Sequence, residues 1–226
     1  MSFGVYVTGT DTGIGKTVAS VALLHALRAH GLRVAGMKPV ASGCTSSGGR
    51  WRNDDALALQ AASDPVPDYE DVNPCALPDP VAPELAAQRA GIGIDTDLIL
   101  AAHARLADRA DAVVVEGVGG WMAPLTSRLM QSDMAGLLRV PVLMVVGVRL
   151  GCINHALLTA RAIAADGAHL AGWIANVLDP EMDGVADNIA MLRARMPASC
   201  WGVLPHAPDA DPRVLAGHLR LPMLAD

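Results

Sequence analysis

The sequence predicts an α/β protein built on a mostly parallel, doubly wound sheet flanked by helices on both faces. Short apolar segments alternate with stretches of helical period along the chain, as they do in repeated strand–helix–strand units. Two segments, Ala112–Val115 and Pro141–Val146, are apolar at every position, which is typical of strands covered by helices on both sides. Functional residues in such sheets lie at the carboxyl ends of the strands.

Continuous apolar segments define the expected strands. They are Phe3–Thr8, Arg33–Lys38, Asp111–Glu116, Val142–Val148, Leu170–Asn176 and Trp201–Leu204. Apolar residues at helical spacing define the expected helices. These are Lys16–Ala29, Asp54–Ala62, Glu84–Ala90, Asp95–Arg109, Ser132–Leu138, Ile153–Ala165 and Val185–Arg195. Because the sequence contains no repeat and no linker composition, residues 1–226 are expected to form one domain.

Two stretches interrupt this alternation. Residues Cys44–Asn53 are rich in glycine and serine and are expected to form a loop. Residues Asp64–Pro83 are dense in proline and acidic side chains, and no regular structure is expected there. Loops of this length inside a compact domain are usually functional or mobile.

A glycine-rich segment from Gly9 to Thr17 connects the first expected strand to the first helix. Its glycines let successive backbone N–H groups turn towards phosphate oxygens, and the helix N-terminus adds its dipole. Lys16 can then reach the β- and γ-phosphates, and the Thr17 hydroxyl can ligate Mg²⁺. Five residues, rather than the usual four, separate Gly9 from Gly15. This variant phosphate loop predicts a nucleotide site in a three-layer P-loop NTPase fold.

A Mg²⁺ site beside Thr17 requires carboxylates. Glu116 stands at the end of an apolar strand and is followed by Gly117–Gly120, which places an acid at the strand tip where the metal is expected. Asp54 and Asp55 open the helix after the glycine/serine loop. Asp54 is more simply an N-cap or first-turn acid, whereas Asp55 fits either role.

The composition argues against several classes of function. The net charge of −6 and the pI of about 5.6, without a basic stripe, argue against nucleic-acid binding. The longest apolar run, Val140–Val148, is shorter than the roughly 18 residues of a membrane span. The four cysteines lack metal-ligand or disulfide spacing and no signal peptide is recognisable. We therefore expect a soluble, cytoplasmic protein with reduced, mostly buried thiols.

Lysine is rare in this chain, because only Lys16 and Lys38 stand against fifteen arginines. A position that keeps lysine under such a bias needs a compact ammonium with three donors, or an amine whose pKa can shift. Lys16 belongs to the phosphate loop. Lys38 lies at the end of the strand after the phosphate-loop helix and is expected to face the same crevice, with chance placement as the alternative.

Several segments together resemble the dethiobiotin synthetase family. They are Val7–Thr12 with Gly15–Thr17, Lys38–Gly43, Asn53–Leu57, Val72–Pro74, Val115–Trp121, Gly151–His155 and Ala175–Asn176. The most specific blocks are KPVASG (Lys38–Gly43) and GCINH (Gly151–His155). The resemblance implies an ATP- and Mg²⁺-dependent cyclo-ligase of biotin biosynthesis, which closes a cyclic urea on 7,8-diaminononanoate with CO₂ and gives dethiobiotin, ADP and phosphate.

The chemistry implied by the resemblance has three steps. A substrate amine captures CO₂ as a carbamate, the carbamate attacks the γ-phosphate of ATP, and the second amine closes the ring on the resulting carbamic–phosphoric anhydride. Such a reaction needs positive charge around both the carbamate and the transferring phosphoryl group. Lys16, Lys38 and a Mg²⁺ ion would supply it.

The resemblance also implies roles for individual residues. Lys16 and Lys38 are the implied catalytic residues, and the implied metal ligands are Thr17, Asp55 and Glu116. The implied substrate contacts are Thr12, Ser42, Gly151, Cys152 and Asn154. The implied ATP site comprises Gly13, Ile14, Gly15, Lys16, Thr17, Val18, Asp55, Glu116, Gly117, Val118, Gly119, Asn176, Val177, Pro205, His206 and Ala207.

In this family the GCINH block reaches the substrate carboxylate from a neighbouring subunit, which implies a homodimer with the substrate site at the interface. Simpler alternatives exist for Asn154 as a helix N-cap, for Asn176 as the end of a strand and for Pro205 as the start of a turn. Residues Asp79–Pro83 resemble the segment that borders the substrate, with a surface loop as the alternative.

The chain departs from the family pattern at three positions. Gly13 stands where some relatives carry an acid, so that only its backbone N–H can contribute. Asn188 stands where the family pattern has a tyrosine that helps to seat the substrate tail. Pro212 replaces an acidic contact on the adenine side, next to Asp211.

Three other classes of protein share some of these features. Partition-type ATPase switches carry a lysine early in the phosphate loop, where this chain has Asp11. Amidase-type ligases acting on corrinoid acids need a source of ammonia, usually a glutaminase domain, for which 226 residues leave no room. A small-molecule kinase is compatible with the phosphate loop alone, but the KPVASG block argues against it.

Overall fold

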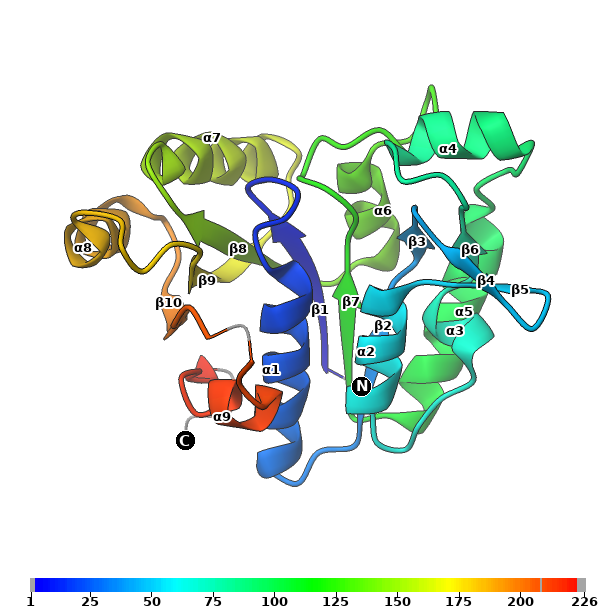
Figure 1. The fold of residues 1–226 in the computed structure, drawn as a ribbon, viewed down its shortest axis with the longest axis horizontal. Helices are drawn as coiled ribbons and strands as arrows, with labels where there is room; N and C mark the ends of the chain where they lie inside the picture. Colours follow the sequence, from blue (N-terminus) through cyan, green and yellow to red (C-terminus); the bar gives the residue numbers. More distant parts are fainter. Residues whose placement is uncertain (1–2, 208, 223–226) are drawn as a thin grey trace.

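The computed structural model describes residues 3–207 and 209–222. Within them, six strands form a parallel sheet in the order β10–β9–β8–β1–β7–β2 (Figure 1). The strands are β1 (Phe3–Gly9), β2 (Val34–Met37), β7 (Ala112–Glu116), β8 (Val142–Val148), β9 (Leu170–Val177) and β10 (Cys200–Leu204). The predicted doubly wound parallel sheet is confirmed.

Helices cover both faces of the sheet and complete three layers. The helices on one face are α1 (Lys16–Ala29), α2 (Asp54–Ala62) and α9 (Pro212–Ala216), and those on the other are α4 (Pro83–Ala90), α5 (Thr96–Arg109), α6 (Gln131–Leu138), α7 (Cys152–Ala165) and α8 (Val185–Arg195). Alternate residues of β1 point to opposite faces of the sheet. Val5 and Val7 therefore join the apolar core under α1 and α2, and Tyr6 joins the core under α5 and α7.

The helices and strands predicted from the sequence are all present. The bounds of α1, α2, α8 and β8 are as predicted, and the others differ by one residue at one or both ends. Helix α5 begins after Asp95, whose carboxylate accepts hydrogen bonds from the backbone N–H groups of Asp97 and Leu98. Strand β2 ends at Met37, so that Lys38 lies just beyond the strand tip.

The prediction of a loop at Cys44–Asn53 was wrong. This segment contains an antiparallel hairpin of β4 (Thr45–Ser47) and β5 (Arg50–Arg52), with Trp51 exposed on β5. Its two turn residues, Gly48 and Gly49, have φ angles of 58° and 77°. A two-residue hairpin turn of this kind requires positive φ at both positions, which glycine adopts without strain.

The prediction that Asp64–Pro83 has no regular structure was also wrong. This segment contains α3 (Tyr69–Val72) and β6 (Cys75–Ala76), and β6 pairs in parallel with β3 (Val40–Ala41). The backbone N–H of Lys38 donates to the Val72 carbonyl over 2.7 Å, and Asn73 Nδ2 donates to the Lys38 carbonyl over 2.7 Å. Because long-range hydrogen bonds hold the segment beside the tip of β2, local periodicity gives no signal for it.

In residues 3–207 and 209–222, no helix has the length and apolar character needed to cross a membrane. The four cysteines, which all lie in these ranges, are free thiols, and Cys44, Cys75 and Cys152 are buried. The expectation of reduced, mostly buried thiols agrees with this arrangement.

Candidate active site

The phosphate loop, residues Gly9–Gly15, connects the tip of β1 to the first residue of α1. Gly15 is the N-cap of α1 with a φ of 81°. A Cβ atom at this position would lie 2.1 Å from Asn176 Nδ2, and that amide donates to the Ile14 carbonyl over 2.9 Å. Glycine is therefore required at position 15 both by the backbone conformation and by the close approach of β9.

Lys16, the first residue of α1, is buried and lies over its own loop. Its Nζ donates to the Asp11 carbonyl over 2.9 Å. Burial and the neighbouring charge of Lys38 lower the pKa of Lys16 to about 8. An ammonium held this way has few competing partners and can turn towards phosphate oxygens that enter the loop.

Lys38 and two carboxylates form a charged cluster at the tips of adjacent strands. Glu116 is the last residue of β7, Lys38 follows β2, and Asp55 lies in the first turn of α2. Lys38 Nζ lies 2.6 Å from Glu116 Oε1 and 3.0 Å from Asp55 Oδ2. Thr17 Oγ1, from the first turn of α1, donates to the same Glu116 oxygen over 2.9 Å. The fold thus joins residues from four parts of the sequence.

The cluster holds Lys38 in its charged form. Burial alone would lower the pKa of Lys38, but the charges and hydrogen bonds of Glu116 and Asp55 outweigh it and raise that pKa. Burial would raise the pKa of Asp55, but Lys38 and Thr17 hold it below its usual range. Lys38 therefore acts as a fixed cation rather than as a base near neutral pH.

The second oxygen of Glu116 identifies a place for a cation. Glu116 is fully buried, and within the described residues its Oε2 atom has no hydrogen-bond partner. Such a group is costly unless a ligand satisfies it. The same part of the chain holds no cluster of three or more His, Cys, Asp or Glu side chains that would bind a metal unaided. Thr17, Asp55 and Glu116 instead fit Mg²⁺, which is bound through one or two carboxylates together with substrate phosphates.

Two adjoining cavities open at this end of the sheet. The first, of about 440 Å³, is lined by Thr12, Gly13, Gly15, Lys16, Thr17, Val18, Lys38, Ala41, Ser42, Asn53, Asp55, Glu116, Val118 and Gly119. The second, of about 490 Å³, shares Thr12, Ser42, Val118 and Gly119 with the first and is otherwise mostly apolar, with Pro80–Pro83, Gly120, Ala123 and Pro124. A larger hollow of 840 Å³ lies around Arg28 and Arg213 and is lined by no phosphate-loop residue.

Most of the predicted phosphate and metal residues line the first cavity, as do Thr12 and Ser42 of the predicted substrate contacts. Two residues of the phosphate side do not: Ile14 is buried beneath the loop, and Gly117 contributes its carbonyl, which accepts from Lys38 Nζ over 3.3 Å. A Cβ atom on Gly117 would lie 2.0 Å from Gln131 Nε2 and 2.9 Å from the Tyr6 hydroxyl. Glycine is therefore required at position 117 by the buried side chains of Gln131 and Tyr6, whose proximity no local sequence pattern indicates.

The predicted adenine-side residues lie along the tips of β9 and β10. Asn176 is the next-to-last residue of β9, and its side-chain amide donates to the Ile14 carbonyl of the phosphate loop. Pro205, His206 and Ala207 follow β10 directly and are not among the residues that line the two cavities. Asp54 is an exposed first-turn acid, since the N-cap of α2 is Asn53.

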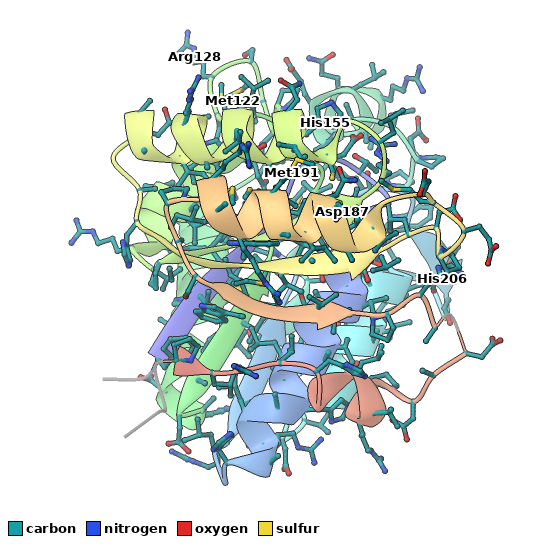
Figure 2. The ribbon with its side chains drawn as sticks, turned by 90° about the vertical axis from the view of Figure 1, so that its left-hand side faces the viewer. Met122, Arg128, His155, Asp187, Met191 and His206 are labelled. Carbon is teal, nitrogen blue, oxygen red and sulfur yellow. The ribbon has the colours of Figure 1, made fainter. Side chains whose placement is uncertain are left out.

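The GCINH block lies apart from both cavities. Gly151, with a φ of 92°, is the N-cap of α7, so the alternative that Asn154 caps this helix was wrong. Cys152 is buried and its Sγ lies 3.9 Å from Asn188 Oδ1, whereas Asn154 is exposed. Figure 2 shows this face of the molecule, with His155 on α7 and with Asp187 and Met191 on α8. Within the described chain, these predicted substrate contacts do not meet the others.

Sequence reasoning missed several residues that position the site. The Tyr69 hydroxyl accepts from the Asn53 backbone N–H over 2.8 Å and lies 3.2 Å from Asn73 Oδ1, which ties α3 to the start of α2. The Val72–Pro74 segment is part of the family resemblance, and the hydrogen bond from the Lys38 backbone N–H to the Val72 carbonyl shows what this segment does: it holds Lys38 at the strand tip. Arg149 forms an ion pair with Asp11 of the phosphate loop, a pairing that no local pattern indicates.

The phosphate loop at the tip of β1, with a lysine and a threonine opening α1 and an acid at the tip of the adjacent β7, defines a P-loop nucleotide-binding protein. Solved structures with this fold include a chain of the MinC:MinD cell division protein complex of Aquifex aeolicus, with a TM-score of 0.56, 14% identity, and coverage of 96% of this chain and 87% of that one. Cell division protein FtsY of Thermotoga maritima has a TM-score of 0.52 and 17% identity, covering 96% and 67% of the two chains. A family model described as an AAA domain matches residues 4–214.

Curated relatives are much closer in sequence. The ATP-dependent dethiobiotin synthetase BioD of Xanthomonas euvesicatoria pv. vesicatoria is 60% identical over 217 residues, which is 96% of this chain and 97% of that protein. The protein of the same name from Xylella fastidiosa is 56% identical over 215 residues, or 95% of each chain. The chain belongs to the ATP-dependent dethiobiotin synthetase family, and the resemblance read from its motifs is confirmed.

Proposed function

We propose that this chain, as one ATP-dependent ligase domain over residues 1–226, converts 7,8-diaminononanoate, CO₂ and ATP into dethiobiotin, ADP and phosphate. The observation that carries the proposal is the convergence of Lys16, Lys38 and the Thr17–Asp55–Glu116 set on one cavity. The apolar cavity beside it fits the aliphatic chain of the diamine. The family assignment supports the same reaction.

In the proposed reaction one amine nitrogen bonds to the carbon of CO₂ and releases a proton to solvent, which leaves a carbamate. A carbamate oxygen then attacks the γ-phosphorus as the bond to ADP breaks, giving the carbamic–phosphoric anhydride. Finally the second amine attacks the anhydride carbonyl carbon, loses a proton and expels phosphate as the cyclic urea closes. Each step concentrates negative charge on oxygens near the cavity.

The chain's own residues supply positive charge and position. Lys16 would hold the β- and γ-phosphates above the loop, and Lys38, kept protonated by its carboxylate neighbours, would stabilise the carbamate and the transferred phosphoryl group. Thr12 and Ser42 line both cavities and would orient the diamine between them. Asn176, Val177 and residues 205–207 would contact the adenine.

Thr17, Asp55 and Glu116 would hold Mg²⁺, with the unpartnered Glu116 oxygen as a ready ligand. The ion, when bound, would neutralise phosphate charge and favour one orientation of the triphosphate. The role of these residues in Mg²⁺ binding is testable without turnover. Glu116→Gln should weaken Mg²⁺-dependent nucleotide binding while leaving metal-free nucleotide binding comparatively unchanged.

We also propose a homodimer in which the GCINH block completes the substrate site of the partner. The first turn of a helix has backbone N–H groups without intrahelical partners, which suit a carboxylate, yet Gly151, Cys152 and Asn154 at the start of α7 do not line this chain's cavities. Nearby apolar side chains are exposed, with exposed fractions of 91% for Leu150, 55% for Leu158 and 42% for Met191. Such a patch is typical of a protein interface. A cytoplasmic location is proposed with it.

The decisive test measures phosphate release from MgATP with diaminononanoate and bicarbonate both present, and with each omitted in turn. We expect release to require both, and a product with the mass of dethiobiotin to appear in equal amount. Release that is indifferent to the diamine would remove the proposal. Phosphorylated diamine without free phosphate would indicate a kinase instead.

A further inference from the structure

The ion pair between Asp11 and Arg149 is not used by the proposed reaction. Asp11 lies within the phosphate loop, and Arg149 lies between the end of β8 and the GCINH block. The Arg149 guanidinium donates to Asp11 Oδ2, and the two side chains are 46% and 47% exposed. The pair therefore joins the nucleotide end of the site to the segment that precedes α7.

Asp11 is held from three directions. Its Oδ1 atom accepts from the backbone N–H of Thr12 over 2.7 Å, which fixes the local turn. Its carbonyl oxygen accepts from Lys16 Nζ over 2.9 Å, and its Oδ2 atom faces Arg149. A phosphate that draws the Lys16 ammonium into the loop must remove one of these three contacts. We therefore expect the contacts of Asp11 to change when a phosphate occupies the loop.

Residues 150 and 151, which follow Arg149, are open to solvent, and the next residue, Cys152, is buried. Leu150 is 91% exposed, and no atom would lie within 4 Å of a Cβ at Gly151. The backbone N–H of Cys152 donates to the Arg149 carbonyl over 3.0 Å, so that the position of Arg149 is passed directly to the start of α7.

Close to the Asp11–Arg149 pair, the phosphate loop is also in direct contact with β8. The backbone N–H of Thr10 donates to the Val145 carbonyl over 3.1 Å, and a Cβ on Gly147 would lie 2.8 Å from Ile14 Cγ2. The loop and the end of β8 are therefore already packed together at residues 145 and 147. Arg149 extends this contact by charge to the first residues of the GCINH block.

We propose that the Asp11–Arg149 ion pair couples the phosphate loop to residues 149–154, so that nucleotide and diamine bind cooperatively. Arg149 is then a positioning residue. The inference rests on the proposed function, in which Gly151, Cys152 and Asn154 contact the diamine carboxylate across the dimer. Coupling of this kind is reciprocal, because each ligand must tighten the binding of the other by the same factor.

The test compares the Kd of a non-hydrolysable ATP analogue with and without 7,8-diaminononanoate, in the absence of bicarbonate. In the unmodified protein the diamine should lower the Kd. Arg149→Gln and Asp11→Asn should each reduce this factor by about two- to fivefold, the range for an exposed ion pair. Asp11→Asn keeps an oxygen acceptor for the Thr12 N–H, so that the local turn is retained.

Three controls separate coupling from general stability. The double variant Asp11→Asn/Arg149→Gln should lose no more coupling than either single variant. Arg149→Lys keeps the positive charge and should retain part of the coupling that Arg149→Gln loses. Arg33→Gln breaks another exposed ion pair, in which Arg33 Nη2 lies 2.7 Å from Asp111 Oδ1, and should leave the factor unchanged.

The proposal is overturned if the diamine leaves the analogue's Kd unchanged in the unmodified protein. It is equally overturned if the factor survives in Arg149→Gln, if the two single effects add, or if Arg33→Gln lowers the factor as much. Loss of the proposed function is recognised separately, because phosphate release would then not depend on the diamine. Phosphate release that requires the diamine, with no coupling in binding, removes only this inference.

Discussion

Two regions of the molecule are implied to contact substrate: the tips of β1, β2 and β7, and the start of α7. They differ in how far their side chains are buried and paired within the chain. At the strand tips, Lys38 is 3% exposed and Glu116 is fully buried, and each is paired within the chain. At the start of α7, Leu150 is 91% exposed and Asn154 lies on an open surface. Lys38 and Glu116 at the strand tips are paired before any ligand arrives, whereas the start of α7 presents exposed apolar and polar side chains. In the proposed homodimer, the phosphoryl chemistry is built into one chain and the second chain anchors the substrate.

The strand tips around Lys38 and Glu116 are called the closed region below, and the start of α7 around Leu150 and Asn154 is called the open region. The largest expected effect is at the closed region. Lys38→Arg should reduce kcat about 10²- to 10³-fold, the cost of losing one preorganised charge in an active site, while nucleotide binding stays nearly intact. A planar guanidinium cannot replace a compact ammonium between Asp55 and Glu116. Steady-state kinetics and analogue titration on the same preparation measure both quantities. Near-normal kcat would remove Lys38 from the mechanism.

The next effect is at the open region. Leu158→Asp places a charge on the exposed face of α7 and should disrupt the proposed dimer, raising the KM for diaminononanoate about tenfold or more while the nucleotide Kd changes little. Sedimentation and kinetics report the two consequences. Leu98→Asp on α5, where the leucine is 48% exposed, is the matched control. A monomeric variant with an ordinary KM would show that the start of α7 does not serve the partner's site.

A pH titration of nucleotide binding tests the phosphate loop at the strand tips. Lys16 has its pKa lowered to about 8 in the ligand-free site, and phosphates require its charged form. Above pH 8 the lysine must regain a proton to bind them, so nucleotide affinity should fall, approaching tenfold per pH unit. Below pH 8 affinity should be flat with respect to this group. Calorimetry of Lys16→Met, in which the dependence disappears, provides the control.

The smallest effect compares two glycines of the same loop. Gly13 and Gly15 have φ angles of 71° and 81°, so alanine is strained at both, by about 1 kcal/mol. Only at Gly15 would the new Cβ meet Asn176, whose bond to Ile14 would then be lost at about 1 kcal/mol more. Gly15→Ala should therefore melt about 2–4 °C below Gly13→Ala. Equal melting temperatures would show that Asn176 does not constrain the loop.

The sequence predicted the closed region better than the open one. Glu116 after four apolar residues, Lys38 after the next strand and the loop before α1 could be placed because parallel strands bring their carboxyl ends to one edge. Helix α3 and strand β6 escaped prediction, since hydrogen bonds from Lys38 and Asn73 hold them. The short helix α9 was missed as well. The Asp11–Arg149 pair joins residues 138 apart in sequence, and such a pairing has no local signature.

Trp51, on the hairpin that precedes α2, gives this protein an optical property of its own. The other three tryptophans, Trp121, Trp173 and Trp201, have exposed fractions of 3%, 0% and 3%, whereas Trp51 has 41%. Water-quenched, red-shifted emission should therefore come mainly from one indole. Because β5 leads through Asn53 into the helix that carries Asp55, that indole should report ligand arrival in real time, without a dye.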